Sequence, residues 1–514
     1  MLSRLWAGGR PAPRVPLMTS KPFLYVLVFV VGAASLGAEI AVARLMAPFF
    51  GASTIVWANT IGVVLVALAV GYWLGGRLGD RHPASRGLCL LVMAAAVLLA
   101  LVPFVARPFF DVSVDALDSL SAGAFAGSLM GVLVLIAVPV ILLGACSPYA
   151  IRLTLPDIEH SGRIAGRLYA VSTAGSLVGT MLAALVLIPF TGTQRTFLVF
   201  AIALAVVAAA GLGWRFAPLP AVLAAAIAIP VGTIKGTDNG RVLYEGETTL
   251  QYARVVEEPD GARVLELNEG QAIHSLYRPG SYLTGGYWDG MVTLPFATMP
   301  QQPRRVAILG NGAGTTSRAY GRFFHRARID AVEIDPELTE LGHRYFHLRS
   351  GPKLTVHDED ARPWLRQSSG RYDVIVVDSY RQPYIPFYLT TREFFALAGD
   401  RLAPGGVVVV NVGHPSGSDE LETVIGRTMA EAFTTVFRDP FDETNTLLLG
   451  SEAPATETRL RSAAAGLPRP LAPIARSQAA RIGPRLPGGT VYTDDLAPVE
   501  WLVDRSILGY AAGE

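Results

Sequence analysis

The chain carries a glycine-rich turn and a carboxylate whose spacing suits the binding of a nucleoside. An apolar run at 306–309 leads into a Gly-x-Gly-x-Gly turn made by Gly310, Gly312 and Gly314. A second apolar run ends on Glu333, 23 residues after Gly310. Glycines in such a turn let a ligand approach the backbone, and a carboxylate after the second strand can hold a ribose diol. The pattern therefore predicts a nucleoside site.

Two further carboxylates follow later strands of the same segment. Asp360 comes just after a third apolar run, and Asp378 ends a fourth. The carboxyl ends of parallel strands meet at one edge of a sheet, so these acids and Glu333 are expected to form an acidic rim above the glycine turn. Each acid alone could instead cap a helix, and Asp335, next to Pro336, is expected to do only that. Three acids at successive strand ends favour nucleoside binding.

Alternating strands and helices are expected to position this rim. Strands are predicted at 305–309, 329–333, 354–357, 372–378 and 406–411, with helices at 336–346 and 391–402. Strands that alternate with helical segments indicate a parallel sheet with its ligand at the carboxyl ends of the strands. The sequence therefore predicts an α/β Rossmann-like domain. Its extent is 301–450, after a small β-rich subdomain over 236–300 and before a C-terminal tail over 451–514.

Residues 23–235 differ in composition and predict an all-α transmembrane bundle. Seven apolar stretches approach the roughly 20 residues that cross a bilayer. They lie near 23–47, 54–76, 87–106, 122–145, 165–190, 194–213 and 217–234. The basic N-terminus, 1–22, and the basic loop 76–82 belong on the cytoplasmic side. Seven spans would put the C-terminal domain on the other side, away from cytosolic nucleosides. We expect a cytoplasmic domain, and hence one stretch that is re-entrant, split or missed.

Composition excludes several function classes. The formal net charge is +1, so no global basic field suggests nucleic acid. Two cysteines, Cys89 and Cys146, provide neither a disulfide framework nor zinc-ligand spacing, and no metal is predicted. An ionisable Glu39 in the first apolar stretch is a functional candidate, or else a helix-end partner of Arg44. Small residues four apart permit close helix contact, unless they reflect ordinary membrane glycine content: Gly71, Gly75, Gly79, Gly175 and Gly179.

The soluble half resembles spermidine synthase, a polyamine aminopropyltransferase. The whole chain resembles bacterial inner-membrane proteins in which a multi-pass bundle is fused to such a domain. The resemblance rests on several motifs: the turn 310–314, the run 332–335 (Val-Glu-Ile-Asp), the pair Asp360-Ala361, the run 372–379, and Gln251 with Tyr287-Trp-Asp289 in the β-rich subdomain. It implies a fold of the S-adenosylmethionine-dependent transferase type.

The resemblance also implies a reaction. In the family an amine attacks the carbon next to the sulfonium of decarboxylated S-adenosylmethionine, and 5'-methylthioadenosine leaves. By resemblance, the catalytic residues are Asp378, Asp289 and Tyr287. The residues that would bind the nucleoside are Gln251, Gly310, Gly312, Gly314, Glu333, Asp360, Ala361 and Arg381. The expected partners are this nucleoside, an amine and the lipid bilayer, with no nucleic acid; a homo-oligomer is left open.

The sequence departs from the family where the amine should bind. Ala313 replaces a family Asp in the glycine turn, Leu283 and Thr284 replace an acidic pair, and Arg381 replaces a second Asp after the fourth strand. A guanidinium can pair bidentately with a carboxylate. Undecarboxylated S-adenosylmethionine carries one, so this nucleoside is an alternative ligand. Arg381 could equally point to solvent or to the membrane domain.

Three functions remain open from the sequence. The first is amine alkyl transfer of the polyamine type. The second uses S-adenosylmethionine itself, as a lyase or a methyltransferase. The third is a sensor or transporter gated by the nucleoside. Tyr380 and Tyr384 could close over the site as a lid or pack against the β-rich subdomain, and the tail acids Asp494 and Asp495 could return to it.

Overall fold

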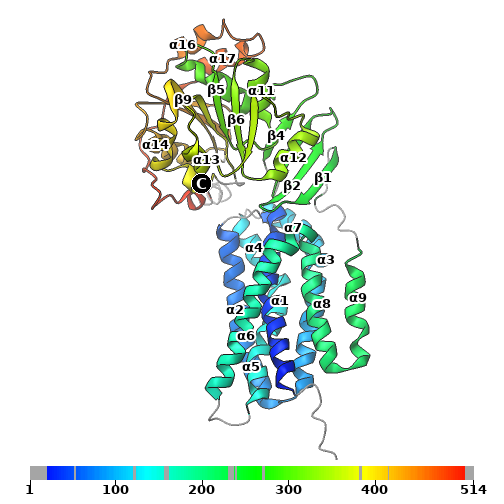
Figure 1. Cartoon of the computed structure of the whole chain (residues 1–514). Coiled ribbons are helices and arrows are strands. Elements are labelled where there is room, and N and C mark those ends of the chain that lie inside the picture. The colour runs from blue at the N-terminus through cyan, green and yellow to red at the C-terminus, as the bar shows by residue number, and fades with distance from the viewer. Residues whose placement is uncertain are drawn as a thin grey trace, which may run out of the picture. The chain divides into compact units, whose positions relative to one another are not determined.

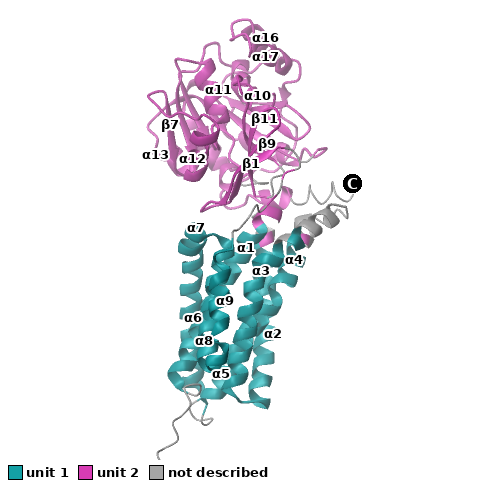
Figure 2. Cartoon of the chain, turned by 90° about the vertical axis from the view of Figure 1, so that its right-hand side faces the viewer, with its two compact units in different colours: residues 1–46, 57–113, 128–232 teal, residues 47–56, 114–127, 233–514 magenta. Residues whose placement is uncertain are grey.

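The computed structural model describes residues 20–50, 54–119, 123–155, 161–229, 235, 237, 240–268, 272–380, 385–414 and 416–503. The chain divides into two compact units (Figures 1 and 2). One is helical and comprises Met1–Met46, Trp57–Ser113 and Ser128–Gly232. The other contains all of Thr233–Glu514. Arg381 and Tyr384 lie outside the described residues.

The helical unit contains α-helices that run back and forth along one bundle (Figure 1). Six helices of the described part are long and apolar enough to cross a membrane. The bounds are α1 Lys21–Phe50, α2 Thr54–Arg81, α3 Ser85–Ser119, α4 Gly123–Leu135, α5 Ala137–Thr154, α6 Ser161–Leu182, α7 Ile188–Thr191, α8 Thr193–Leu212 and α9 Pro218–Ala226, with a π-helical turn at Ala183–Leu187 between α6 and α7.

Two of the seven expected stretches differ in the structure. The stretch 122–145 is divided at Ile136 into α4 and α5, and the candidate span is Ala137–Thr154. Pro139 in the first turn of α5 has no N–H to continue the hydrogen-bond ladder of α4, which accounts for the break. In the described part of the stretch 217–234, which ends at Ile229, the α-helix is α9, and its nine residues are fewer than a bilayer span needs.

Glycines spaced four residues apart lie where one helix contacts another. A Cβ at Gly75 of α2 would come within 2.1 Å of the Ala145 carbonyl oxygen on α5. A Cβ at Gly179 of α6 would come within 2.0 Å of the Ala33 carbonyl oxygen on α1. No larger residue fits at either place without moving a helix. The spacing therefore reflects backbone packing between helices rather than background glycine content.

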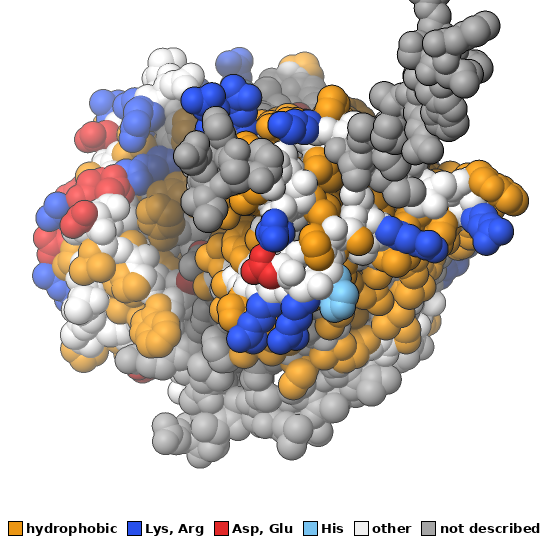
Figure 3. All heavy atoms as spheres, turned by 90° about the horizontal axis from the view of Figure 1, so that it is seen from below, with side chains coloured by type: hydrophobic (Ala, Val, Ile, Leu, Met, Phe, Trp, Pro, Cys, Tyr) orange, Lys and Arg blue, Asp and Glu red, His pale blue; other side chains and the backbone are white. Residues whose placement is uncertain are grey.

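One end of the bundle is basic, and we call it the basic end. There Arg152 Nε lies 3.0 Å from Asp80 Oδ1, and the Tyr149 hydroxyl donates to the Ala84 carbonyl oxygen at 3.1 Å. Figure 3 looks at the molecule from this end and shows basic side chains gathered there. The exposed basic residues of the loops and helix ends here include Arg77, Arg81, Arg86, Arg152, Arg163 and Arg167.

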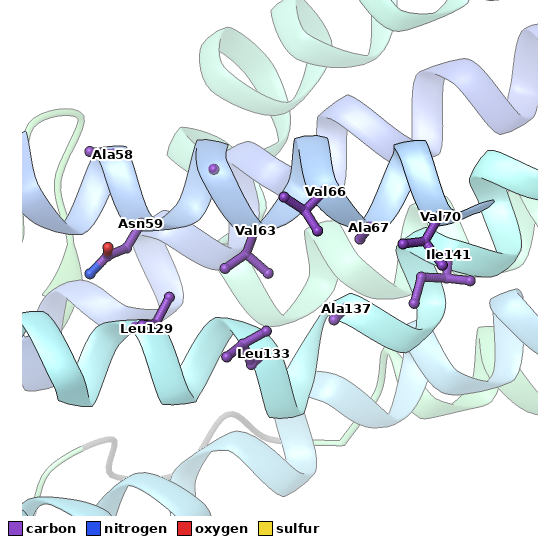
Figure 4. A pocket seen from close by; sticks show the side chains of 11 residues that line it. Ala58, Asn59, Val63, Val66, Ala67, Val70, Leu129, Leu133, Ala137 and Ile141 are labelled. Carbon is purple, nitrogen blue, oxygen red and sulfur yellow. The ribbon is translucent and has the colours of Figure 1, made fainter. Parts of the chain in front are cut away.

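A pocket of about 440 Å³ lies between α2, α4 and α5 (Figure 4). Its lining is aliphatic apart from Asn59, whose amide donates to the Ser128 hydroxyl at 2.9 Å. Glu39 is not among the residues that line it. The pocket therefore suits an apolar group and offers nothing that would bind a cation or a nucleoside.

The soluble unit begins with a four-stranded antiparallel sheet. Its strands are β1 Arg241–Glu247, β2 Tyr252–Glu257, β3 Arg263–Leu267 and β4 Ile273–Tyr277, in the order β1-β2-β3-β4. The short runs expected in the β-rich subdomain form β2 and β3. Leu265 and Leu267 of β3 pack with Ala253 and Val255 of β2 against Ala313 of the glycine turn. This sheet therefore supports the turn directly.

The second sheet has eight strands in the order β12-β10-β11-β9-β8-β5-β6-β7. Its parallel part runs from β9 to β7, and β10, β11 and β12 are antiparallel additions. The bounds are β5 Arg305–Leu309, β6 Arg328–Glu333, β7 Leu354–Asp358, β8 Tyr372–Val377, β9 Leu402–Gly413, β10 Thr435–Pro440, β11 Asn445–Ser451 and β12 Gly483–Pro484. The strand order reverses between β5 and β8, and ligands bind at such a switch point.

Both faces of this sheet are buried. Val306 and Ile308 of β5 lie in one apolar cluster, and Ala307 and Leu309 lie in the cluster on the other face. A strand buried on both faces reads as a continuous apolar run, which is why these strands are visible in the sequence. The remaining helices are α10 Tyr287–Thr293, α11 Thr315–Phe323, α12 Pro336–Tyr345, α13 Ala361–Gln367, α14 Arg392–Asp400 and α15 Glu420–Met429.

The described part of the expected tail is folded onto the sheet. Helices α16 Glu457–Ala463 and α17 Ala472–Ala479 bury Leu460, Leu471 and Ala475 against one face of the sheet. Strand β12 pairs with β10, and Tyr492 is buried on the other face. Strand β9 also begins at Leu402, earlier than the expected 406, because it pairs with Tyr372 across an irregular register. The described residues 451–503 thus pack onto the soluble unit and contribute some side chains to its core.

Candidate active site

The glycine turn after β5 packs against the end of β8. Gly310, Gly312 and Gly314 have φ angles of +87°, +50° and +95°, a region that L-residues with side chains rarely adopt. A Cβ at Gly310 would lie 2.4 Å from the carbonyl oxygen of Asp378. Gly310 therefore has to be glycine for two reasons, its conformation and this close approach. The turn and Asp378 meet at the switch point, as the sequence predicts.

Glu333, at the end of β6, is fixed beside the turn. Its Oε2 accepts a hydrogen bond from the Gly312 N–H at 2.7 Å, and its Oε1 accepts one from the Asp335 N–H at 3.1 Å. The side chain is only 7% exposed, and burial raises the pKa of this carboxyl to about 7. Two backbone donors hold it in one orientation. Its carboxylate is therefore fixed beside the turn, where the sequence predicts the acceptor of a ribose diol.

Asp335 does more than cap a helix, so that expectation was too narrow. Its Oδ1 accepts from the Glu337 N–H at 3.3 Å, which is the cap of α12. Its Oδ2 accepts from the Thr248 hydroxyl at 2.6 Å and from the Gln251 amide at 3.2 Å. Asp335 therefore joins the β-rich subdomain to the end of β6. The Gln251 amide nitrogen is used in this contact, and binding of the nucleoside by Gln251 stays a prediction.

Asp360 and Ala361 lie at the start of α13. Asp360 accepts from the Arg362 N–H at 3.0 Å and from the Tyr388 hydroxyl at 2.8 Å. Arg362 forms two hydrogen bonds with Asp494, at 2.8 and 2.6 Å. The tail thus returns to the edge of the candidate site at Asp494. Asp495 is exposed.

Asp378 is the best-placed proton acceptor of the site. It accepts a hydrogen bond from the Asn411 amide at 3.0 Å, and the side chains of Tyr287 and Trp288 are further hydrogen-bonding partners. Its side chain is partly accessible to solvent. The surrounding protein nevertheless desolvates it and raises its pKa to about 7, against the lowering effect of its three donors. A carboxyl with a pKa near neutrality suits general-base chemistry.

Tyr287 stacks on Trp288 with ring centroids 4.3 Å apart. This stacking keeps the hydrogen-bond donors of both side chains beside the Asp378 carboxylate. The hydrogen bond from Tyr287 lowers the pKa of Asp378, so its removal should raise that pKa above about 7. In a Tyr287→Phe variant we expect the acidic limb of the pH–rate profile to move to higher pH. The measurement is kcat against pH for both proteins. A limb that moves to lower pH, or does not move, would contradict this role.

Asp289 is bound to its own loop. Its Oδ1 accepts from the N–H and the hydroxyl of Thr284, at 2.9 and 3.0 Å, and its Oδ2 accepts from the Gly285 N–H at 2.7 Å. The residue is 3% exposed, and its pKa is raised by burial. This geometry favours a positioning role over the catalytic role that the resemblance implies. Asp289 shapes the loop that leads into Tyr287 and Trp288.

An Asp289→Asn variant tests that role. One oxygen and one NH₂ group would replace two acceptors, so at least one loop donor would lose its partner. We expect a loss of stability of about 1–3 kcal/mol, with the nucleoside dissociation constant unchanged. Denaturant unfolding and isothermal titration measure the two quantities. A normal unfolding midpoint combined with lost turnover would instead support catalysis by Asp289.

Tyr380 is not a free lid residue. Its hydroxyl donates to the Asn411 carbonyl oxygen at 3.1 Å and accepts from the Gly413 N–H. Both partners belong to β9. The expectation that Tyr380 closes over the site or packs on the β-rich subdomain is therefore corrected, since its ring is fixed to the main sheet. Arg381 and Tyr384 are not part of the described chain, and their roles stay predictions.

Three polar side chains at the switch point have buried atoms without a hydrogen-bond partner in the described structure. They are Asn311 (Oδ1 and Nδ2), Ser379 (Oγ) and Asn411 (Oδ1). Asp442, which is exposed, also acts electrostatically on Tyr287. Sequence reasoning missed these roles. Asn411 and Ser379 come at the ends of apolar runs, so their position at the strand ends could have been recognised in the sequence. Asp442 lies in the β10–β11 loop, where no sequence pattern indicates a position near the site.

The parallel sheet, the glycine turn and the acid-bearing strand ends define an α/β domain of the Rossmann-like transferase type. Residues 286–441 match the family model described as spermine/spermidine synthase domain. The C-terminal region of this chain therefore holds a domain of that family. Among the described residues no group of three or more His, Cys, Asp or Glu side chains is placed to hold a metal ion.

Several of the similar proteins are named polyamine aminopropyltransferases. The chain is 34% identical over 191 residues to a probable polyamine aminopropyl transferase of Bifidobacterium longum, which covers 37% of this chain and 42% of that one. It is 24% identical over 441 residues to polyamine aminopropyltransferase 1 of Ralstonia nicotianae, covering 81% of each. The chain spans about half the length of the Bifidobacterium, Vibrio and Pseudomonas relatives, at 42%, 54% and 56%.

Among solved structures, a probable spermidine synthase from Corynebacterium glutamicum is similar with a TM-score of 0.40 and 21% identity. The alignment covers 51% of this chain and 99% of that one.

Proposed function

We propose that the protein is a membrane-integrated enzyme that uses an S-adenosylmethionine-type sulfonium nucleoside and releases 5'-methylthioadenosine, by transfer of the aminopropyl or aminocarboxypropyl chain to an amine. The observation that carries this proposal is Asp378. It lies beside the glycine turn at the switch point, it has three hydrogen-bond donors, and its pKa is about 7. A family match over 286–441 supports the class of reaction.

The step needs little from the protein besides alignment and a proton acceptor. The amine lone pair forms a bond to the carbon next to the sulfonium. The C–S bond breaks, and its electron pair stays on sulfur, which becomes the neutral thioether of 5'-methylthioadenosine. The proton released from nitrogen goes to ionised Asp378. Holding amine and carbon in line supplies much of the acceleration of such a displacement, and a positioned base adds to it.

The other residues of the site have roles at the two ends of the nucleoside. Glu333 would accept hydrogen bonds from the ribose diol, and Asp360 with Ala361 would hold the adenine. The buried Ser379 hydroxyl and the Asn411 Oδ1 flank Asp378 and could accept N–H groups of the amine. Gly310, Gly312 and Gly314 leave room for the nucleoside against the backbone.

Cleavage of undecarboxylated S-adenosylmethionine is the second candidate, and a specific observation favours it. The loop at 281–286 has Leu283 and Thr284, and the oxygens of Asp289 are turned onto that loop. Few acids are therefore free to bind a diamine. In the lyase reaction the carboxylate of the substrate itself displaces 5'-methylthioadenosine, so no amine pocket is needed. Methyl transfer would instead give S-adenosylhomocysteine.

A sensor or transporter is the third candidate, and the bundle offers it little support. The pocket between α2, α4 and α5 is apolar and does not suit a charged nucleoside or amine. Six helices could span a bilayer, which supports the membrane as a partner. The homo-oligomer left open by the sequence stays a prediction.

Product analysis separates the candidates. The full-length protein in detergent is incubated with S-adenosylmethionine or its decarboxylated form, each with and without putrescine as a probe amine, and the products are identified by mass spectrometry. Formation of methylthioadenosine only when the amine is present supports transfer. Methylthioadenosine with homoserine lactone supports lysis, and S-adenosylhomocysteine supports methyl transfer. Binding without turnover of either nucleoside would overturn the enzymatic proposal.

A further inference from the structure

Asn311 is the residue of the glycine turn that the proposed chemistry leaves without a role. Its side chain is 5% exposed, and both Oδ1 and Nδ2 are buried without a hydrogen-bond partner in the described structure. A buried polar atom that lacks a hydrogen-bond partner destabilises the folded protein. A native site accepts such a cost where a ligand supplies the partners.

The neighbours of Asn311 place its backbone within the site. Gly310, one residue before, packs on the backbone of Asp378 and Ser379, where the base lies. Gly312, one residue after, donates its N–H to Glu333, the proposed ribose acceptor. Asn311 therefore lies between the groups assigned to the sugar and to the reacting end. In this region the nucleoside would place the amino-acid or aminopropyl chain that extends from its sulfur. We call this chain the tail of the nucleoside.

The chemistry of a carboxamide distinguishes the two possible tails. A decarboxylated tail ends in an ammonium, which has donors only and would satisfy Oδ1 but not Nδ2. An amino-acid tail has an ammonium and a carboxylate, and would satisfy both atoms. Ala313 is fully buried among apolar side chains, so the side chain at that position offers no carboxylate for a lone ammonium.

We propose that Asn311 binds the amino-acid end of undecarboxylated S-adenosylmethionine, with Nδ2 donating to the carboxylate and Oδ1 accepting from the ammonium. This inference rests on the proposed function and specifies its donor. It stands on residues 310–314, independently of Arg381.

Isothermal titration of the full-length protein with three probes tests the inference. The probes are S-adenosylmethionine, its decarboxylated form and 5'-methylthioadenosine, which has no tail. The natural protein should bind S-adenosylmethionine at least about tenfold more tightly than the decarboxylated form, the equivalent of one hydrogen bond to a charged group. Asn311→Ala should remove this preference. Asn311→Asp should reverse it, because a second carboxylate repels the substrate carboxylate and attracts the ammonium.

Methylthioadenosine is the internal control, since neither variant should change its affinity more than about twofold. Preference of the natural protein for the decarboxylated form would overturn the inference. So would an equal loss for all three probes in Asn311→Ala when the melting temperature is unchanged. Failure of the natural protein to bind methylthioadenosine would instead defeat the proposed function, so the two failures can be told apart.

A second, independent observation concerns the path of the chain after α8. A Cβ at Gly211 would lie 2.4 Å from Cys89 Sγ and 2.9 Å from the Phe23 ring, so the end of α8 lies with the starts of α1 and α3, at the basic end. From there α9 packs along α8 (Figure 1). Gln194 Nε2, in the first turn of α8, lies 3.5 Å from the Ile229 carbonyl oxygen. The chain therefore returns to the opposite end of the bundle.

The sequence of this segment is compatible with a crossing. No charged residue occurs between Arg215 and Lys235. These uncharged residues, 216–234, are about as long in a helix as the roughly 30 Å hydrocarbon core is thick. The positive-inside rule assigns the basic end to the cytoplasm. We infer that the segment crosses the bilayer and that the soluble unit lies on the side opposite the cytoplasm, in place of the cytoplasmic position expected from the sequence.

Labelling of single added cysteines in the full-length protein tests this topology. The two natural cysteines, Cys89 and Cys146, are buried and give a low background. Gln302→Cys places an exposed thiol on the soluble unit, and Arg163→Cys places one at the basic end. In intact cells with a permeable outer barrier, a membrane-impermeant maleimide should label the Gln302→Cys variant alone. After lysis both should react. Labelling of the Arg163→Cys variant alone in intact cells would overturn the inference and restore the cytoplasmic position.

Discussion

An Asp378→Asn variant is expected to lose turnover by about 10²–10⁴-fold, the usual contribution of a positioned base, while it binds the nucleoside nearly as well as the natural protein. The reason is that the asparagine keeps the shape of the side chain but cannot take the proton from the attacking amine. Single-turnover kinetics and isothermal titration measure the two effects separately.

The environment of Asp378 decides how this result is interpreted. Asn411, Tyr287 and Trp288 all donate hydrogen bonds to the carboxylate. In the variant, the NH₂ group of the asparagine faces at least one of these donors, and that hydrogen bond is lost. A small loss of stability is therefore expected as well. Glu359→Gln is the matched control, because it removes an exposed carboxylate near another strand end. If turnover and affinity fell by the same factor, Asp378 would be a binding residue and not the base.

The pH profile gives an independent signature of the same residue. Burial raises the pKa of Asp378 from 3.8 to about 7. Only the ionised form can accept a proton, so kcat should fall as the pH drops below about 7 and level off above it. Any residual activity of the Asp378→Asn variant should lack this fall in kcat at acidic pH. A limb that persisted in the variant would show that another group titrates.

Local patterns in the sequence predicted the positions of most of the residues that we assign to the nucleoside. Strands β5 and β6 are buried on both faces, so each appears as an apolar run, and the glycines that follow β5 mark the tight turn. Glu333 and Asp378 could be assigned to one edge because parallel strands all end there. Such features depend on residues close in sequence, and the structure places them where they were expected.

The remaining features depend on contacts between distant residues. Asn411 binds Asp378 from 33 positions away, and Asp494 binds Arg362 from 132 positions away. No local pattern indicates that the oxygens of Asp289 bind the loop at Thr284, or that Ala313 is buried against β2 and β3. The path of the seventh apolar stretch could not be predicted for a related reason. Its composition fits a span, but only packing shows that its described helix, α9, runs along α8.

A Glu333→Gln variant is expected to weaken nucleoside binding by roughly 10²–10³-fold, because two charge-assisted hydrogen bonds to the ribose diol become weaker or are lost. The amide can still accept from either the Gly312 N–H or the Asp335 N–H, but its NH₂ group then faces the other donor. A Glu333→Ala variant should lose binding altogether. Isothermal titration with methylthioadenosine isolates this effect, since that probe keeps the ribose and lacks the tail.

The affinity of the natural protein should also depend on pH. The pKa of Glu333 is raised to about 7, so binding should strengthen as the pH rises through this value, when the carboxylate becomes the better acceptor. The Glu333→Gln variant should show no such dependence. Glu340→Gln, an exposed acid on α12, serves as the control and should leave both affinity and its pH dependence unchanged. Unchanged affinity in Glu333→Gln at all pH values would remove Glu333 from the ribose site, and the diol would need another acceptor.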